Sequence, residues 1–308
     1  MELTQLPEEC ISHIISFTTP RDACRLSLVC TLFGSASDSD VVWEKFLPSD
    51  YRDFISQSVV FPSTTLNSMP KKLLYFHLCD NPIIVADNKM SFSIERESGK
   101  KCFMVGARGL SITWSKSDTP QYWKWISLPE SRFPEVAKLS YVWWLHIIAK
   151  VETRILSPQT TYVACLVFKL AESTCSFEDR PVQLRVDFEG REDGEGLSVV
   201  LDSRGNIDDV MPQDREDGWK EVEMGEFFNE DGEDGSVLCS LKERYWHRGG
   251  ISQAHKVGHL MIPLAQVYAR TGFHSLTQVC AQSRFQNHMG SKTNGRLPTQ
   301  DFISAPLA

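Results

Sequence analysis

The sequence predicts an α+β multidomain fold. It divides into a small all-α module at residues 1–50, a helical linker at 51–90, an antiparallel β-sandwich at 91–245 and a poorly ordered tail at 246–308. Three observations predict this order. Apolar residues recur at helical spacing in the first module, alternate with polar residues in the sandwich, and lose any sustained period in the tail. The length of 308 residues also suits two modules of ordinary size better than one.

Short helices are expected in the first module. Ile11, Ile14 and Ile15 fall at i, i+3 and i+4, which places them on one stripe of a helix. The segment TTPRD at 18–22 is a helix start signal: its threonine can cap, its proline suits the first helical position and its aspartate can complete a capping box. The segment SASDSDVVWEKF at 35–46 then ends one helix and predicts a last short amphipathic one.

In the linker we expect a loop followed by one helix, in which Leu73, Leu74 and either His77 or Leu78 form a buried stripe. A metal or catalytic role is the alternative for His77, but a lone histidine on an apolar face more often packs there.

In the sandwich, alternating apolar and polar residues predict strands at 89–95, 102–107, 110–114, 141–152, 161–171, 181–190, 197–202 and 219–228. Many short strands with polar turns between them are typical of a sandwich.

Charge and composition exclude several classes of protein. The block Asp187–Asp234 has 18 acidic residues against 4 basic ones, so we expect no nucleic-acid partner. No apolar run reaches the roughly 18–20 residues of a membrane span, so we expect no membrane partner. Nine cysteines without a C-x-x-C pair, no secretory signal at the start and no Asn-x-Ser/Thr site favour the cytoplasm or the nucleus, without disulfides or structural zinc.

The tail, Trp246–Ala308, holds five of the eight histidines but only one i, i+4 pair of them, which is weak evidence for a metal site. It has no sustained period, although HLMIPLAQVYA at 259–269 allows one short helix or strand. We therefore expect the tail to be poorly ordered. G-x-S-x-G, H-E-x-x-H, P-loop and G-x-G-x-x-G motifs are all absent, so we expect no enzyme, no catalytic residue and no cofactor.

The first module has more large apolar side chains than a bundle of roughly 45 residues can bury by itself. Either the second module covers the excess or another protein does. The segment Leu6–Pro48 resembles an F-box: a leading Leu-Pro pair, an Ile-x-x-Ile-x-x-Phe helix, SLVC and a late tryptophan occur in the family order. Thr31 stands where F-boxes often have a basic residue, which we expect to weaken only a rim contact.

The F-box resemblance implies a Skp-type adaptor as partner and, through it, a cullin. The protein would then be the substrate-recognition subunit of an SCF-type ubiquitin ligase. The adaptor-binding residues that this resemblance implies are Leu6, Pro7, Ile11, Ile14, Leu28, Val29, Cys30, Leu32, Phe33, Trp43 and Phe46.

The second module resembles the Nictaba-related phloem-protein lectins of plants. ARGLSITW, YWKW and SRFPEVAKL carry the resemblance, and REDGWKEVEMGEFFNEDGEDG extends it to about Asp234. An F-box followed by such a domain is a known plant arrangement. The resemblance implies a jelly-roll-like lectin sandwich that binds a glycosylated or other target protein, with an N-acetylglucosamine- or mannose-type glycan as the sugar. The carbohydrate-binding residues it implies are Trp114 and Trp123, and we add Trp125 because it shares a strand face with Trp123.

Two alternatives stay open. Leu110, Ile112 and Trp114 alternate on one strand face, so core packing is as consistent with the pattern at Trp114 as sugar contact, and the same holds for Trp123. The second is a carbohydrate-binding lectin that acts without a ligase.

The chain also departs from the lectin family. The turn WSKSDTPQYW is two residues longer than usual, which would displace one indole from the other. The family's last strand, of the type GLxxxGIEIRPK, is replaced after SLKERYW by the patternless tail. We therefore expect a sandwich that is one strand short, with an exposed edge.

Overall fold

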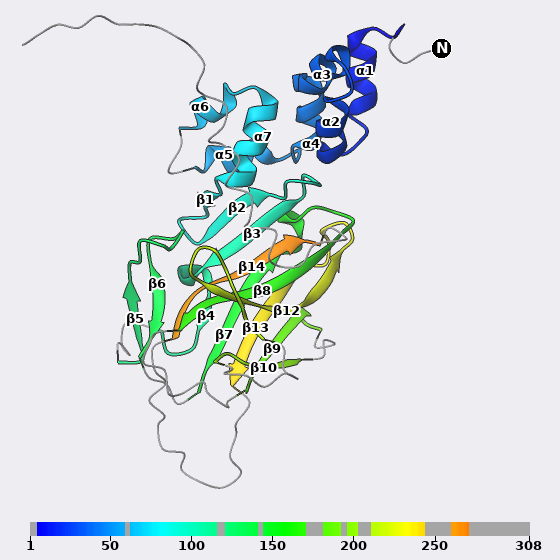
Figure 1. The fold of residues 1–308 in the computed structure, drawn as a ribbon. Helices are drawn as coiled ribbons and strands as arrows, with labels where there is room; N and C mark the ends of the chain where they lie inside the picture. Colours follow the sequence, from blue (N-terminus) through cyan, green and yellow to red (C-terminus); the bar gives the residue numbers. More distant parts are fainter. Residues whose placement is uncertain are drawn as a thin grey trace, which may run out of the picture.

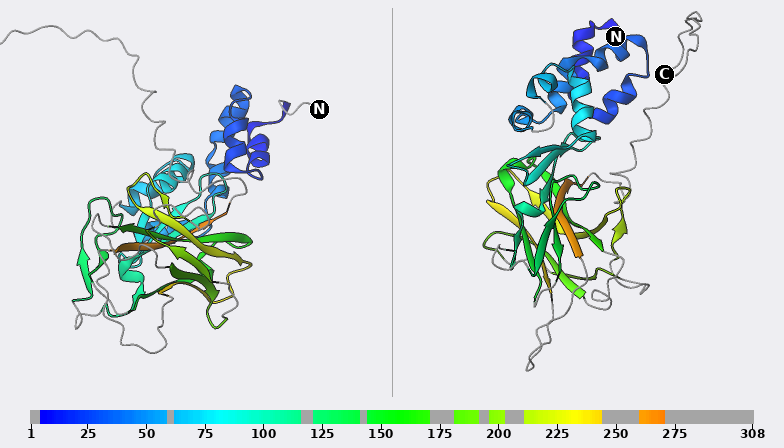
Figure 2. Two further views of the ribbon diagram at one scale, coloured as in Figure 1. Left: turned by 60° about the horizontal axis from the view of Figure 1, so that its bottom comes forward. Right: turned by 90° about the vertical axis from the view of Figure 1, so that its left-hand side faces the viewer.

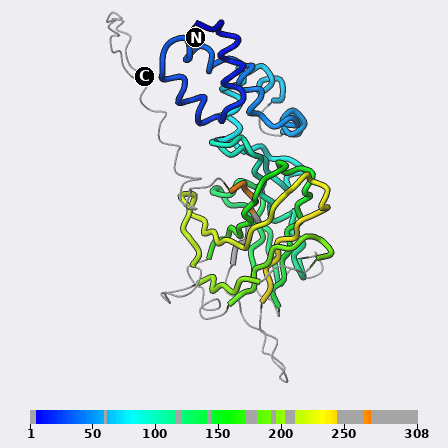
Figure 3. Tube along the Cα trace, turned by 90° about the vertical axis from the view of Figure 1, so that its right-hand side faces the viewer, coloured from blue at the N-terminus to red at the C-terminus, as the bar shows by residue number. Residues whose placement is uncertain are grey.

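The computed structural model describes residues 5–58, 62–115, 121–140, 144–170, 181–191, 196–202, 211–243 and 260–270. A helical part precedes two antiparallel β-sheets and sits on one end of them (Figure 1; Figure 2; Figure 3). The predicted α+β order is confirmed. Within the described ranges, none of the helices has the length and apolar character needed to cross a membrane.

The helices are short. Their bounds are α1 (Glu8–Ile15), α2 (Pro20–Leu26), α3 (Thr31–Asp38), α4 (Asp40–Phe46), α5 (Tyr51–Ser56), α6 (Ser63–Asn67) and α7 (Lys71–Asp80). The start signal of α2 is confirmed: Thr19 Oγ1 accepts the backbone N–H of Asp22 at 3.1 Å, and Pro20 is the first helical residue. Part of the loop expected in the linker is helix α6, which at five residues is too short to show a period. In α7, Leu74, Tyr75 and Leu78 are buried while Leu73 is exposed, so the prediction was wrong about Leu73.

The first sheet, sheet A, has nine strands: β1 (Ile83–Val85), β2 (Met90–Ile94), β3 (Lys101–Gly106), β5 (Trp123–Ile126), β6 (Val136–Leu139), β8 (Thr160–Leu170), β11 (Gln213–Asp214), β12 (Lys220–Asn229) and β14 (Leu260–Ala269). Its order is β1-β2-β3-β14-β8-β12-β11, and β6 pairs with both β14 and β5. The sheet begins at Ile83, earlier than the predicted boundary at residue 91, because β1 is only three residues long and shows no alternation.

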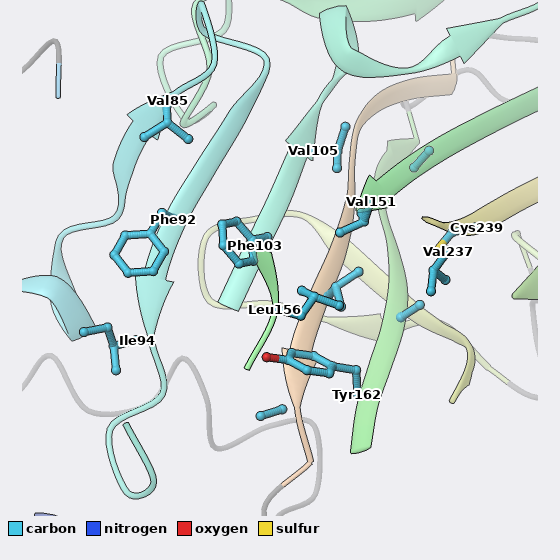
Figure 4. Close-up of a cluster of buried hydrophobic side chains, with 14 of the residues drawn as sticks. Val85, Phe92, Ile94, Phe103, Val105, Val151, Leu156, Tyr162, Val237 and Cys239 are labelled. Atoms are coloured by element: carbon cyan, nitrogen blue, oxygen red, sulfur yellow. The ribbon is translucent and has the colours of Figure 1, made fainter. Parts of the chain in front are cut away.

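The second sheet, sheet B, has five strands: β4 (Ser111–Ile112), β7 (His146–Glu152), β9 (Pro181–Phe188), β10 (Leu197–Val200) and β13 (Ser236–Glu243). Their order is β10-β9-β13-β7-β4. The inner faces of the two sheets share one apolar core, to which β2, β3, β8 and β13 contribute Phe92, Phe103, Tyr162 and Val237 (Figure 4). This is the predicted sandwich.

The prediction that the sandwich is one strand short was wrong, whereas the short helix or strand allowed at 259–269 is present as β14 (Leu260–Ala269). Strand β14 lies at the centre of sheet A, paired with β8 from Leu260↔Leu170 to Ala269↔Tyr162 and with β3 over Leu264–Val267. The sandwich therefore does not lack a strand there, and 260–270 is ordered; the rest of 246–308 lies outside the described residues. Val267 and Tyr268, which point to opposite faces, are both buried, and a strand covered on both faces has no polar alternation for the sequence to reveal. Pro263 falls where the register with β8 shifts, a place that tolerates a residue without a backbone N–H.

The helices and the sandwich meet in a tight joint, in which α7 packs on β2 and α5 packs on β1. The ring of Phe54 in α5 stacks on Phe92 of β2, with centroids 4.2 Å apart. The Tyr75 hydroxyl of α7 lies within hydrogen-bond distance of the carbonyl oxygens of Glu95 and Arg96, at 3.1 and 3.0 Å. We call the loop 95–100, between β2 and β3, the joint loop.

A buried ion pair completes the joint. Lys101 Nζ, at the start of β3, donates to Asp50 Oδ2 at 2.8 Å, and the lysine side chain is almost wholly buried. The backbone N–H of Lys101 donates to Ser157 Oγ, and its carbonyl accepts the Tyr162 hydroxyl. This network ties the α4–α5 turn to β3 and β8, so the helical part and the sandwich are held in one relative position.

Candidate functional site

An exposed apolar surface lies on the first helices. Phe17 is 73% exposed, Leu28 is 86% exposed, and Ile14 and Val29 are also largely open to solvent. We call these four residues the helical patch. Ile14 and Phe17 lie at the end of α1 and just after it, and Leu28 and Val29 lie in the connection between α2 and α3. Helices α1 and α2 both pack on α3. Large side chains that a folded chain leaves open in this way are typical of a surface for another protein.

The local fold explains why these side chains point outward. In α1, Ile11 and Ile15 are buried and the intervening Ile14 is not, so the predicted stripe is split between core and surface. After α2 ends at Leu26, the backbone N–H of Leu28 donates to the carbonyl of Arg25, and that of Val29 donates to the carbonyl of Leu26. The connection is therefore ordered although its side chains are exposed.

Not every predicted adaptor-binding residue is on this surface. Pro7 and Cys30 are exposed, and Leu6, Leu32 and Phe33 are half-buried. Ile11, Trp43 and Phe46 are buried, so the structure gives no support to the prediction that their side chains contact a partner. Phe17 and Val41 are exposed and were missing from the predicted set, although Phe17 is the third apolar residue of the Ile-x-x-Ile-x-x-Phe pattern.

Trp43 is buried because α7 covers α4. Its indole Nε1 donates to the carbonyl of Ser37 at 2.6 Å, and its ring contacts Phe46, Tyr75 and Phe76 at centroid distances of 5.5, 5.2 and 5.2 Å. Helix α7 lies outside the F-box pattern, so the pattern by itself did not reveal this cover. Trp43 connects the first module to the joint.

The predicted sugar-binding tryptophans have three different environments. Trp123 is 3% exposed and its indole Nε1 donates to the carbonyl of Thr113 at 3.1 Å, so the structure favours the alternative that Trp123 packs in the core. Strand β5 turns it into the core. Trp114 is 36% exposed, and its ring centroid lies 4.9 Å from that of Tyr122. Tyr122 was not among the predicted site residues.

Trp125 is half-buried on the same core as Trp123, as expected for residues two apart on a strand. The guanidinium of Arg108, in the 3₁₀ turn η2 (Ala107–Gly109), lies 3.6 Å from the centroid of the Trp125 ring. Arg108 Nε also donates to Glu135 Oε2 at 2.9 Å, and this hydrogen bond lowers the pKa of the Glu135 carboxyl. One face of Trp125 is therefore occupied, and the structure gives no support to Trp125 as a sugar platform.

A further tryptophan, Trp144, is 41% exposed. Its neighbour Trp143 lies outside the described residues, as do positions 116–120 of the long turn after Trp114.

We call the end of the sandwich at which β7 begins the Trp114 end, because β4, which ends two residues before Trp114, pairs with Ile147 and Ile148 of β7. The backbone N–H of Thr113 donates to the carbonyl of His146, which places Trp114 beside the first residue of β7. Strand β7 runs from there to Glu152, and the following segment reaches Ser157, which accepts the backbone N–H of Lys101 in the joint. The helical patch and the Trp114 end are therefore separated by the length of the sandwich.

Other chemistry is sparse in the part of the chain that the structure describes. It contains no group of three or more His, Cys, Asp or Glu side chains that could hold a metal ion. Burial raises the pKa of the Cys102 and Cys239 thiols to about 12, so neither is a thiolate at neutral pH.

Comparison with known proteins identifies the family. The F-box domain family matches residues 3–45, and the Phloem protein 2 family matches residues 100–253. F-box protein PP2-B10 of Arabidopsis thaliana is 47% identical over 228 residues, which cover 73% of this chain and 80% of that protein. The chain belongs to the F-box proteins with a phloem protein 2 (PP2) domain.

Other relatives agree with this assignment. F-box protein SKIP3 of the same plant is 42% identical over 236 residues, which cover 75% of this chain and 77% of SKIP3. Among solved structures, a CBM22-2 xylan-binding domain from Paenibacillus barcinonensis matches with 11% identity and a TM-score of 0.30, covering 53% of this chain and 92% of that one. A likeness this low gives no basis for carrying over a sugar site.

Proposed function

We propose that this F-box protein is the substrate-recognition subunit of an SCF-type ubiquitin ligase, in which the helical patch binds a Skp-type adaptor and the PP2 domain binds a glycosylated or other target protein. The observation that carries the proposal is the helical patch itself. Leu28 is 86% exposed, whereas Ile11, Ile15 and Val42 of the same module are buried.

Burial of the helical patch supplies the driving force for adaptor binding. Moving a large apolar side chain from water into a packed interface stabilises a complex by roughly 1.5–3 kcal/mol. Leu28, Phe17 and Val29 therefore offer several kcal/mol together, part of which offsets the loss of freedom on association. The exposed Pro7 and Cys30 belong to the same F-box segment and would lie at the edge of this interface.

The role needs no catalytic residue in this chain. A recognition subunit accelerates ubiquitin transfer by holding the target near the conjugating enzyme, which converts a bimolecular step into an effectively unimolecular one. The joint supports such a role, because it fixes the helical patch at one end of the molecule and the Trp114 end at the other. Strand β8, with eleven residues, spans the sandwich between them over about 35 Å.

The test of the adaptor assignment is co-purification with a Skp-type adaptor. We expect Leu28→Asp combined with Val29→Asp to abolish recovery of the adaptor, because the change places two charges in the interface while leaving the exposed connection folded. Leu73→Asp is the matched control: Leu73 is also exposed, at 61%, but it lies on α7, outside the F-box segment. Equal recovery of the adaptor by the wild type and the double variant would refute the assignment.

The second candidate function is a carbohydrate-binding lectin that acts without a ligase. It is favoured by the exposed Trp114, which the sandwich presents without any contribution from the helical patch. Binding of glycans by the wild type, together with failure to recover any Skp-type adaptor, would support this function over the ligase role. We propose that either function is carried out in the cytoplasm or the nucleus, which localisation of the tagged full chain tests.

A further inference from the structure

We propose that strand β5 is a docking edge for a target protein, to which an extended segment with anionic side chains, carboxylate or phosphate, adds as a further strand of sheet A. Lys124 of β5 and Lys138 of β6 bind the charges of this segment. The inference rests on the proposed function in one respect, because it names the class of target that the PP2 domain holds. It requires no sugar on that target.

Strand β5 is the outer strand on its side of sheet A. Among the described residues it pairs with β6 alone, and it lies at the left side of the sandwich in Figure 1. The backbone N–H of Ser140 donates to the carbonyl of Tyr122, so every second residue from there on, including Lys124, directs its backbone groups toward β6. The backbone N–H and C=O groups of Trp123 and Trp125 therefore point away from β6. Such a row of groups is the template on which an extended peptide adds as a strand.

Two lysines face each other beside this edge. Lys124 and Lys138 are register partners in a hydrogen-bonded pair, so their Cα atoms are about 5.5 Å apart and their side chains share one face. Like charges placed directly opposite each other destabilise a sheet. Within the ranges that the structure describes, neither ammonium group lies within ion-pair distance of a carboxylate. An anionic side chain from outside relieves the repulsion between them, and the pair therefore selects an acidic partner.

The positive charge extends beyond this pair. Through β14, Lys138 is in register with Lys169 of β8, so that Lys124, Lys138 and Lys169 form one row across the sheet. The loop between β5 and β6 contains two carboxylates, and both are engaged elsewhere. Glu130 is paired with Lys169 at 2.6 Å, and Glu135 is paired with an arginine at 2.9 Å. The two lysines nearest the edge thus keep their charge for a partner.

The lysines lie on the outer face of sheet A. Trp123, Ala137 and Leu139 belong to the core that the two sheets share, and strand alternation puts Lys124 and Lys138 on the other face. Lys124 is exposed and Lys138 is half-buried. A strand added beside β5 has one side chain opposite Lys124 on this face. The two residues form a non-hydrogen-bonded pair with Cα atoms about 4.5 Å apart, which is close enough for an ion pair between their side chains.

Charge decides between this edge and two alternatives. At the opposite edge of sheet A, Asp214 of β11 and the neighbouring Glu216 and Asp217 are exposed, which repels an acidic strand. Pairing of two copies of the chain through β5 places a second Lys124–Lys138 pair beside the first and adds like charges. A lysine in the middle of an edge strand therefore disfavours self-pairing and leaves acidic segments as the partners.

Fluorescence anisotropy of the full chain with labelled peptides tests the charge recognition. The probes have threonine at alternate positions and glutamate, phosphoserine, glutamine or lysine at the others. We expect the glutamate and phosphoserine peptides to bind and the glutamine peptide not to bind, and the tighter of the two ligands distinguishes a carboxylate from a phosphate as the preferred anion. Lys124→Ala should weaken binding about threefold.

Charge reversal makes this test specific. Lys124→Glu combined with Lys138→Glu should abolish binding of the glutamate peptide and create binding of the lysine peptide, which a merely structural role of these lysines does not predict. Lys242→Glu is the matched control: Lys242 is an exposed lysine on β13 of sheet B, and its reversal should leave the affinity for the glutamate peptide unchanged.

Strand addition needs a backbone readout. On addition of the glutamate peptide to ¹⁵N-labelled protein, the amide protons of Trp123 and Trp125 should exchange about tenfold more slowly, whereas that of Lys124, already bonded to β6, should not change. A glutamate peptide with N-methylated threonines keeps its charge but cannot donate hydrogen bonds to β5. It should bind about tenfold more weakly.

The outcomes separate this inference from the proposed function. Equal binding of the glutamate and glutamine peptides, or unchanged binding after charge reversal, overturns the acidic partner. Equal binding of the N-methylated peptide, or unchanged exchange at Trp123 and Trp125, overturns strand addition. A dimer in sedimentation experiments that Lys124→Glu dissociates identifies a second copy as the occupant and also overturns the proposal. None of these results changes recovery of the Skp-type adaptor by the helical patch, so the ligase assignment is tested separately by co-purification.

Discussion

The joint loop can be tested at a single glycine. Gly99 has a φ of +72°, and a Cβ at this position would lie 2.6 Å from the carbonyl oxygen of Phe46 in α4. Replacing it by alanine therefore carries two costs. The left-handed backbone costs about 1–2 kcal/mol for a residue with a Cβ. The contact with Phe46 forces the loop or the helix to move, which costs about 1–3 kcal/mol for overpacking in a tight interior. We expect Gly99→Ala to lower the free energy of unfolding by about 2–5 kcal/mol.

The matched control isolates the part of this loss that comes from the joint. Gly218 has a φ of +80° but no atom within 4 Å of the position of a Cβ, so Gly218→Ala carries only the backbone cost of about 1–2 kcal/mol. Urea unfolding of both variants measures the difference, and hydrogen exchange of α4 and α7 should increase in Gly99→Ala alone. If the two variants lose the same stability and α4 exchanges as in the wild type, the helices are not held against the joint loop as we describe.

Three further predictions concern the helical part and the thiols. Ile14→Ala should weaken adaptor binding with little change in stability, because Ile14 is exposed. Ile11→Ala removes a buried side chain and should lower the free energy of unfolding, measured in urea, by about 2–5 kcal/mol. The reverse pattern would contradict the assignment of core and surface on α1. Thr19→Ala should cost about 1 kcal/mol, measured in the same way, because it removes the cap of α2. In native protein near pH 8, iodoacetamide followed by mass spectrometry should modify the exposed Cys30 and spare Cys239, whose buried thiol has a pKa raised to about 12; rapid modification of Cys239 would show that the core opens readily.

The sequence was informative where the physical cause of a pattern is local. The cap of α2 needs only Thr19, Pro20 and Asp22, three consecutive or nearly consecutive residues, and it forms as predicted. The exposure of Ile14 was not predicted in this way, because helical periodicity places Ile11, Ile14 and Ile15 on one stripe and does not show which of them faces solvent. By contrast, the three residues of β1 and the five of α6 are too short for a period to appear, so the start of the sheet and the second linker helix were not predicted.

The candidate sites show the same division. Exposed Leu28 and Val29 were predicted from the F-box resemblance. The burial of Trp43 was not, because its cover comes from Tyr75 and Phe76, more than thirty positions later. Trp114 and Trp123 had equivalent signals in the sequence, since each is an aromatic residue at the edge of a strand. Only the pairing of β5 with β6 decides that Trp123 turns inward.

The sequence by itself determined the order of a helical module and a sandwich. It also determined the F-box and phloem-lectin resemblances, and it showed more apolar surface than the first helices can bury. These properties depend on composition, on periodicity and on short motifs, all of which are encoded by neighbouring residues. Tertiary structure alone decided that β14 fills the centre of sheet A, that the joint loop locks the helices to the sandwich, and that Tyr122 takes the place beside Trp114. Each of these depends on contacts between segments far apart in the chain, and such contacts have no local signal.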